Sequence, residues 1–388
     1  MTRERRKHVD DLRGATRLAI EATRGVTDLV EEMHRGIASG PKVLGRPLEA
    51  PTRLVTGLVY GSIRGVTDVV GASIDLALEQ LARLLGELGE GAPRVEREII
   101  LSALNGVLGD YLAETENPLA IEMSLRANRA EARGRILLMV PGLCMSESQW
   151  LRKDHDHGEA LAAVLDATRV DVRYNSGLHV SSNGRTLSEQ LERLLERWPV
   201  PVEAITIVAH SMGGLVSRSA CRAGQEAGAR WPGLLDKVDF LGTPHHGAPL
   251  ERAGNWFEVI VGKLPYAAPM ARLGRIRSAG VTDLRYGNVL DEHWQGVDRF
   301  AHGPDRRAPV PLPAGPTCYA VAGSGVLGEG DGLVPVASAL GRHDEPALCL
   351  AFAEENTVIF PGVDHMELLA DPQVYAQLLN WLSVTPPT

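Results

Sequence analysis

The segment VAHSMGGLV, residues 208–216, constrains the fold of this chain more than any other stretch, because it places one serine between small residues directly after a β-branched run. A strand that turns sharply into a helix lifts a serine hydroxyl clear of the backbone, provided that the residues two before and two after the serine are small. Ala209 and Gly213 meet this requirement around Ser211. The alternative is a serine that only caps the following helix. The position of Ser211 between a strand and an amphipathic helix favours a catalytic nucleophile.

From residue 134 onward, the sequence predicts an α/β fold. Short apolar runs alternate there with helical or loop stretches such as residues 187–198. Strands that alternate with helices need crossover connections, which produce a mostly parallel sheet covered by helices. The expected strands span residues 135–140, 170–175, 204–209, 237–242, 317–323 and 356–360.

Composition and charge exclude several classes of protein. The chain has 388 residues, 44% of them hydrophobic, which is enough for one large core and a second, smaller unit. Its net charge of −9 and its scattered arginines argue against a nucleic-acid-binding surface. The charged amino terminus lacks the apolar stretch of a secretory signal, and no apolar run reaches the roughly 20 residues that span a bilayer. We therefore expect a cytoplasmic protein without a nucleic-acid partner.

Residues 1–130 are predicted to form a helical region that precedes a catalytic domain at residues 131–388. Apolar residues recur in this region at spacings of three and four, which is typical of amphipathic helices. The sequence RGVTDLV at residues 24–30 returns as RGVTDVV at residues 64–70. The region therefore resembles a doubled helical unit.

A strip of glycines lies within the second repeat. Gly57, Gly61 and Gly65 fall at every fourth position, which on a helix creates a flat strip that another backbone can approach closely. Tight packing against the neighbouring domain is the favoured interpretation. Peripheral contact with a membrane, or formation of a homo-oligomer through these helices, is the alternative.

Residues 248–314 interrupt the alternation of strands and helices and are rich in proline, glycine and arginine. Apolar and aromatic residues occur in this segment without a clear strand period. Such an insertion suits a cap over the carboxyl edge of the sheet, where loops carry binding residues. A solvent-exposed excursion is the alternative.

A nucleophilic serine needs a histidine base and an acid that orients it, both placed after later strands. His365 follows the expected strand at 356–360, and Asp331 lies on a glycine-rich loop after the strand at 317–323. A helix-capping histidine and a turn aspartate are the structural alternatives for these two residues. Asp364 and Glu329 are the nearby alternatives for the acid. Asp364 is the less favoured of the two, because a residue adjacent to His365 in sequence cannot easily place its carboxylate at the Nδ1 atom of His365.

Two backbone N–H groups are candidates for an oxyanion hole, which stabilises the negative charge that develops on the reacting carbonyl. The first belongs to Met212, at the amino terminus of the helix that follows the serine. The second belongs to Leu143, because Pro141 and Gly142 bend the chain directly after the strand at 135–140.

The segment KDHDHG contains residue types that bind metals, namely Asp154, His155, Asp156 and His157. The favoured interpretation is a polar loop in which Asp156 caps a helix that begins near Gly158. We therefore predict no metal site and no cofactor. A calcium or zinc ion that stabilises the loop remains the minority interpretation.

Five segments, in this order, carry a family resemblance: PGL, AHSMGGL, FLGTPHHGAPL, GDGLVP and DHMELL. They resemble the lipase-like branch of the α/β-hydrolase superfamily, which includes GPI inositol-deacylase-like proteins and bacterial esterases. The resemblance covers roughly residues 134–384 and implies an α/β-hydrolase fold, to which the patterns above add the inserted cap and the N-terminal helical region. Two departures stand out: Ala209 replaces the first glycine of the serine motif, and Pro141 stands where many lipases have histidine.

The resemblance also implies roles for individual residues. Ser211 would be the nucleophile, Asp331 the orienting acid and His365 the base. The N–H groups of Leu143 and Met212 would form the oxyanion hole. The segment LGTPHHG follows the strand at 237–242, so its two histidines, His245 and His246, are expected to line the substrate pocket.

The sequence therefore predicts a serine ester hydrolase that works through an acyl-enzyme on Ser211. The substrate is expected to be a small-molecule or lipid ester, and the apolar residues near Leu143 and Met212 favour an apolar acyl chain. An acyltransferase or amidase that uses the same three side chains is one alternative. A non-catalytic hydrolase scaffold, recruited by its helical N-terminal region, is the other.

Overall fold

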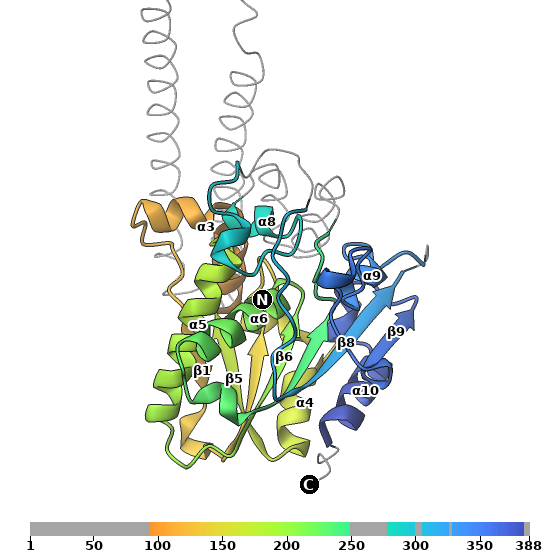
Figure 1. Cartoon of the computed structure of the whole chain (residues 1–388). Coiled ribbons are helices and arrows are strands. Elements are labelled where there is room, and N and C mark those ends of the chain that lie inside the picture. Colours follow the sequence, from red (N-terminus) through yellow and green to blue (C-terminus); the bar gives the residue numbers. More distant parts are fainter. Residues whose placement is uncertain (1–93, 249–277, 299–304, 326–327, 384–388) are drawn as a thin grey trace, which may run out of the picture.

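The computed structural model describes residues 94–248, 278–298, 305–325 and 328–383 (Figure 1). A seven-stranded sheet runs through this part of the chain in the order β1-β5-β2-β6-β7-β8-β9. All neighbouring strands pair in parallel except β1, which pairs antiparallel with β5. The strands are β1 (Ser124–Ala127), β2 (Arg135–Val140), β5 (Ala167–Arg173), β6 (Ala204–His210), β7 (Leu235–Leu241), β8 (Thr317–Ser324) and β9 (Thr357–Pro361), and a separate pair is formed by β3 (Leu151–Arg152) and β4 (His155–Asp156).

Helices surround the sheet (Figure 1). The helix α6 follows β6 directly and packs along α5, where Gly184 of α5 lies against the side chain of Ser219. The α-helices in the described ranges are α3 (Arg94–Glu114), α4 (His157–Val164), α5 (Val180–Glu196), α6 (Met212–Glu226), α8 (Ala279–Asp283), α9 (Val336–Ala339) and α10 (Pro372–Ser383).

Strand β2 shows why the sequence forms a parallel sheet here. Its sequence RILLMV is buried at every position except the first. A parallel strand covered on both faces has no solvent-facing side, so a continuous apolar run suits it better than an alternating one. Its residues Leu138 and Met139 pair with Ile207 and Val208 of β6. The fold class predicted from the sequence is confirmed, and each of the six expected strands is present with its ends shifted by at most a few residues.

Strand β1 corrects one expectation, because it lies within residues that were predicted to be helical. Its four residues pair with residues 170–173 of β5. None of the four is buried; Leu125 and Ala127 alternate with polar residues and pack against the core, but the run is only four residues long. An edge strand of this kind forms through hydrogen bonds to its neighbour, a contact that local sequence patterns do not report.

Helix α3 also belongs to the main core. Leu104, Val107, Leu108 and Leu112 are all buried in the same hydrophobic cluster as the strands of the sheet. The structure therefore groups α3 and β1 with the residues that were assigned to the catalytic domain. The predicted division of the whole chain near residue 130 stays a prediction, because residues 1–93, with the repeat and with Gly57, Gly61 and Gly65, lie outside the described residues.

Part of the predicted cap is described, and it packs at the carboxyl edge of the sheet. The Gly280 N–H of α8 donates to the carbonyl of Gly177, on the segment that follows β5, at 2.9 Å. Ser278 Oγ donates to the carbonyl of Gly106 on α3 at 2.7 Å. This part therefore lies against the domain. The cap as a whole stays a prediction, because residues 249–277 and 299–304 lie outside the described ranges.

The described helices include none that is long and apolar enough to cross a membrane.

Candidate active site

Ser211 occupies a strained turn between β6 and α6. Its backbone has φ 54° and ψ −127°, a conformation that residues with a side chain rarely adopt and that costs of order 1–3 kcal/mol. Two hydrogen bonds hold it: the Ser211 N–H donates to the Leu241 carbonyl at 2.8 Å, and the Gly214 N–H donates to the Ser211 carbonyl at 3.0 Å. The sharp strand-to-helix turn expected from the sequence is present.

Gly213 explains why the turn needs a small residue two positions after the serine. A Cβ at this position would lie 2.7 Å from the Pro141 carbonyl oxygen and even closer to that of Val140. Ala209, two positions before the serine, lies within β6, between Val140 of β2 and Phe240 of β7, and its methyl group is fully buried. The sheet accommodates alanine there, whereas the first turn of α6 requires glycine.

His365 and Asp331 form a buried hydrogen-bonded pair. The Nδ1 atom of His365 lies 2.7 Å from Oδ2 of Asp331, and the N–H of His365 donates to the Asp331 carbonyl at 2.9 Å. The other carboxylate oxygen of Asp331 accepts the N–H groups of Leu333 at 3.0 Å and Val334 at 2.8 Å. Since a carboxylate only accepts hydrogen bonds, a neutral His365 carries its proton on Nδ1 and presents a lone pair at Nε2.

The turn after β7 connects this pair to Ser211. Gly242 follows Leu241, whose carbonyl accepts the Ser211 N–H. A Cβ on Gly242 would lie 3.0 Å from Asp331 Oδ2 and 3.1 Å from His365 Nδ1. Ser211 Oγ and His365 Nε2 are both buried, and neither has a hydrogen-bond partner among the residues that the structure describes. Hydrogen bonds of this kind often tighten only when substrate binds.

The two alternative acids occupy other positions. Oδ1 of Asp364 accepts the N–H groups of Met366 and Glu367, each at 2.9 Å, so it caps the turn that follows. Glu329 is exposed. Of the three candidate acids, Asp331 is the one whose carboxylate contacts the ring of His365.

Met212 follows Ser211 directly, and Leu143 follows Gly142, which approaches Ser211. The N–H groups of Leu143 and Met212 form no hydrogen bond within the described part of the chain. The Met145 N–H donates to the Gly142 carbonyl at 3.3 Å. In a trans peptide the carbonyl and the following N–H point in opposite directions, so the Leu143 N–H points away from this turn. A Cβ on Gly142 would lie 3.0 Å from Cβ of Ser211, which shows how closely this loop approaches the serine.

His210 is a residue of the site that sequence reasoning missed. Its Nε2 atom lies 3.1 Å from the His365 carbonyl oxygen, and the centroids of the two rings are 4.6 Å apart. Burial, reinforced by the positive charge of a protonated His365, lowers the pKa of His210 well below its usual value. A neutral His210 therefore donates from Nε2 and supports the backbone of His365. The sequence feature that could have identified His210 as a residue of the site is its position directly before Ser211.

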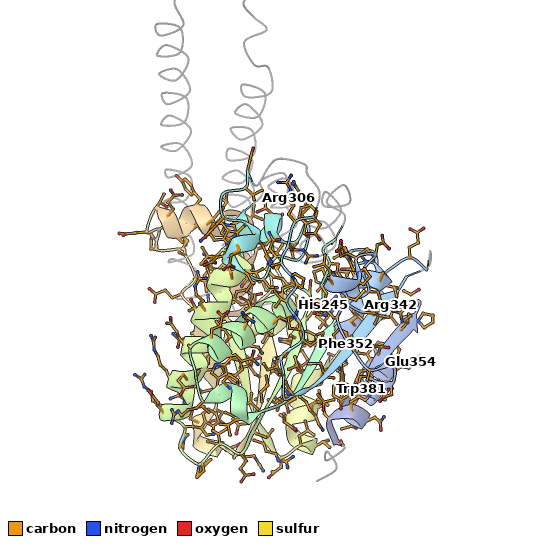
Figure 2. All side chains as sticks on the ribbon, viewed as in Figure 1. His245, Arg306, Arg342, Phe352, Glu354 and Trp381 are labelled. Carbon is orange, nitrogen blue, oxygen red and sulfur yellow. The ribbon has the colours of Figure 1, made fainter. Side chains whose placement is uncertain are left out.

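His245 and His246 follow β7 as expected, but their contacts are with arginines. Nδ1 of His245 lies 3.4 Å from Arg218 Nη1, and Nδ1 of His246 lies 3.3 Å from Arg307 Nη2. The ring of His245 also packs against that of Phe352, 5.6 Å away (Figure 2). Burial and nearby positive charges lower the pKa of His245 well below its usual value and that of His246 to about 4.

No described contact joins either histidine to Ser211, Asp331 or His365. Their role in lining a substrate pocket therefore stays a prediction.

The KDHDHG segment forms a helix cap, as the favoured interpretation predicted. Asp156 is the N-cap residue of α4, and its Oδ1 accepts the Glu159 N–H at 3.1 Å. Its Oδ2 accepts a hydrogen bond from Arg169 Nη1 at 2.8 Å. Both oxygens of this carboxylate thus have a partner. In the described ranges, no three His, Cys, Asp or Glu side chains are arranged to hold a metal ion.

The chain is similar to one protein-family model and to several solved structures. Residues 131–306 match the family model described as PGAP1-like alpha/beta domain. Bacillus licheniformis lipase BlEst2 in its mature form is similar to 68% of this chain over 98% of its own length, with 16% identity and a TM-score of 0.43. Aspergillus fumigatus lipase B is similar to 70% of this chain over 58% of its own length, with 12% identity and a TM-score of 0.42.

A thermophilic esterase from Thermogutta terrifontis, with malate bound, is similar to 68% of this chain over 94% of its own length, with 12% identity and a TM-score of 0.38. No curated protein matches the chain in sequence.

Proposed function

We propose that this chain, whose residues 131–306 match the model of the PGAP1-like alpha/beta domain, is a serine ester hydrolase that forms an acyl-enzyme on Ser211. The observation that carries the proposal is the buried pair of His365 and Asp331, with Nδ1 and Oδ2 2.7 Å apart, beside the strained turn at Ser211. Within the described ranges, Nε2 of His365 has no hydrogen-bond partner, and it is able to accept a proton.

In the first half of the reaction, Ser211 Oγ attacks the carbonyl carbon of the ester while Nε2 of His365 takes the hydroxyl proton. Asp331 stabilises the imidazolium that results. The carbonyl oxygen becomes an oxyanion, to which the unpaired N–H groups of Leu143 and Met212 donate. When the tetrahedral intermediate collapses, His365 gives its proton to the departing alcohol, and the acyl group remains on Ser211.

In the second half, a water molecule attacks the acyl-enzyme and His365 takes its proton. The second tetrahedral intermediate collapses, the carboxylic acid leaves, and the proton returns from His365 to Ser211 Oγ. The sequence of steps needs no cofactor. The apolar side chains of Leu143 and Met212 support an ester with an apolar acyl chain as the substrate.

Hydrolysis of p-nitrophenyl esters from acetyl to palmitoyl tests the proposal with the full chain. We expect Ser211→Ala to lower kcat by at least about 10⁴-fold. The matched control is Ser217→Ala, because Ser217 is a buried serine of the neighbouring helix α6 whose hydroxyl donates within that helix, to the carbonyl of Gly213. Full activity in Ser211→Ala would contradict the proposal.

Product analysis in the presence of an added alcohol or amine distinguishes hydrolysis from acyl transfer, because the same side chains serve either acceptor. Folded protein that neither hydrolyses an ester nor acylates an acceptor would leave the non-catalytic scaffold as the explanation. Three expectations stay predictions. Peripheral membrane contact and self-association through the N-terminal helices involve residues 1–93, which lie outside the described ranges, and a cytoplasmic location is a property that the structure does not test.

A further inference from the structure

Helix α3 packs directly against the loop that supplies the second proposed oxyanion donor. We call residues 141–145, which follow β2, the oxyanion loop. A Cβ on Gly106 of α3 would lie 3.0 Å from the backbone nitrogen of Cys144, and closer still to its Sγ atom. The Cys144 thiol also lies 3.8 Å from the Ala103 carbonyl of α3. The helix therefore approaches this loop as closely as a glycine allows.

Two buried hydroxyl groups also form hydrogen bonds with the oxyanion loop. The Tyr174 hydroxyl donates to the Pro141 carbonyl at 2.8 Å, and Ser176 Oγ accepts the Cys144 N–H at 3.0 Å. Both residues belong to the segment 174–178, which follows β5 and which we call the support segment. Burial raises the pKa of Tyr174 above its usual range, so its hydroxyl stays protonated and able to donate.

These two hydrogen bonds flank the peptide that bears the Leu143 N–H. The bond to Pro141 fixes the peptide plane before Gly142, and the bond from Cys144 fixes the plane after Leu143. Cys144 has a φ of 61°, so the loop does not follow a relaxed path there. Within the loop, the hydrogen bond from the Met145 N–H to the Gly142 carbonyl holds the peptide that bears the Leu143 N–H, and the two bonds from outside hold the peptides on either side of it.

The support segment is in turn held by α3. The Asn175 Nδ2 atom donates to the Gly109 carbonyl at 2.8 Å, and the Gly177 N–H donates to Asn175 Oδ1 at 3.0 Å. A Cβ on Gly109 would lie 2.7 Å from Cγ of Asn175. Helix α3, the support segment and the oxyanion loop therefore form one continuous packing unit.

We propose that Tyr174 and Ser176 are positioning residues of the proposed hydrolase, which aim the Leu143 N–H at the reacting oxygen and depend on the contact between α3 and the support segment for their own placement. Neither side chain touches the reacting atoms. They act through the loop, so their loss affects the transition state more than substrate binding. This inference rests on the serine hydrolase mechanism proposed above.

Ser176→Ala and Tyr174→Phe test the inference in the full chain. Each removes one hydrogen bond to the oxyanion loop and adds no atoms. Because misplacement by about 1 Å costs up to about 100-fold in rate, we expect kcat to fall about 10-fold to 100-fold while KM changes by less than about 2-fold. The matched control is Ser188→Ala, which removes an equally buried hydroxyl that accepts the Trp231 Nε1–H at 3.0 Å, far from the site in α5.

A second measurement does not depend on the choice of ester. A fluorophosphonate reacts covalently with an activated serine, and its phosphoryl oxygen occupies the place of the oxyanion. We expect its rate of reaction with Ser211 to fall by the same factor as kcat in Ser176→Ala and Tyr174→Phe, and to stay unchanged in Ser188→Ala. Melting temperatures of all variants separate this effect from loss of folded protein.

The failure of the inference and the failure of the proposed function are distinguishable. Wild-type kcat and fluorophosphonate rates in both folded variants would overturn the positioning role and leave the hydrolase intact. An equal loss of rate in Ser188→Ala would also overturn it, because the effect would then follow general stability. A wild-type protein that hydrolyses no ester and does not react with the fluorophosphonate would overturn the proposed function, and this inference with it.

Discussion

Replacing Asp331 by asparagine tests the mechanism most directly, because the structure dictates how the new side chain must sit. Oδ1 of Asp331 accepts two backbone N–H groups, from Leu333 at 3.0 Å and Val334 at 2.8 Å. The carbonyl oxygen of an asparagine has to take this place, since an NH₂ group there would leave buried donors facing each other. The NH₂ group of the asparagine therefore faces Nδ1 of His365, where Oδ2 now lies at 2.7 Å.

This orientation inverts the roles of the two ring nitrogens. Nδ1 must then accept a hydrogen bond, so the proton of the neutral imidazole moves to Nε2. A protonated Nε2 cannot take the proton from Ser211. We expect kcat to fall about 10⁴-fold, the size of the loss when a triad imidazole is held in the wrong tautomer. That loss corresponds to about 5 kcal/mol in the activation free energy.

The assay is steady-state hydrolysis of the best p-nitrophenyl ester by Asp331→Asn. The control is Asp364→Asn, because Asp364 also caps two backbone N–H groups through Oδ1 but stands outside the pair. We expect the control to lose less than about threefold in kcat, in line with a turn cap that takes no part in proton transfer. A folded Asp331→Asn variant that retains a tenth of wild-type kcat would refute the tautomer argument.

Three further predictions concern stability and packing. Asp239 is fully buried in β7, and neither of its carboxylate oxygens has a hydrogen-bond partner in the described part of the chain. Burial raises the pKa of Asp239 well above its usual value. The charged carboxylate therefore destabilises the folded state increasingly as the pH rises from the unfolded-state pKa toward the raised one. Asp239→Asn should therefore raise the free energy of unfolding by about 1–3 kcal/mol at pH 8, with a smaller gain at pH 4; thermal unfolding at both values checks this, and an equal gain would contradict it. A chain that starts at residue 115 lacks α3, whose buried apolar side chains contribute about 8–15 kcal/mol to the free energy of unfolding, and it should yield no folded protein by circular dichroism. A chain that starts at residue 94 should fold. A folded chain from residue 115 would show that α3 is dispensable. Gly213→Ala should lower kcat at least about tenfold and reduce the melting temperature, because the new Cβ would clash with two carbonyl oxygens. The control is Gly233→Ala, which should change neither quantity, because a Cβ there has no neighbour within 4 Å.

The sequence by itself determined the parts of this protein that depend on local pattern. Continuous apolar runs predicted the parallel strands, and small residues around Ser211 predicted a turn that lifts a serine at the end of β6. The order of the strands then selected Asp331 and His365, because the carboxyl ends of parallel strands meet at one edge of the sheet. The cap at Asp156 was also a local signal.

The tertiary structure alone decided which distant segments support that site. Strand β1 is only four residues long and contains no buried residue, and its pairing with β5 holds it at the edge of the sheet. Gly106 and Cys144 meet across 38 positions of sequence, and His210 reaches the carbonyl of His365 across 155. Contacts of this kind depend on how the chain returns in space, and no periodicity or motif in either segment encodes them. Local preferences therefore identified the reacting side chains, whereas long-range packing determined how the backbone around them is held.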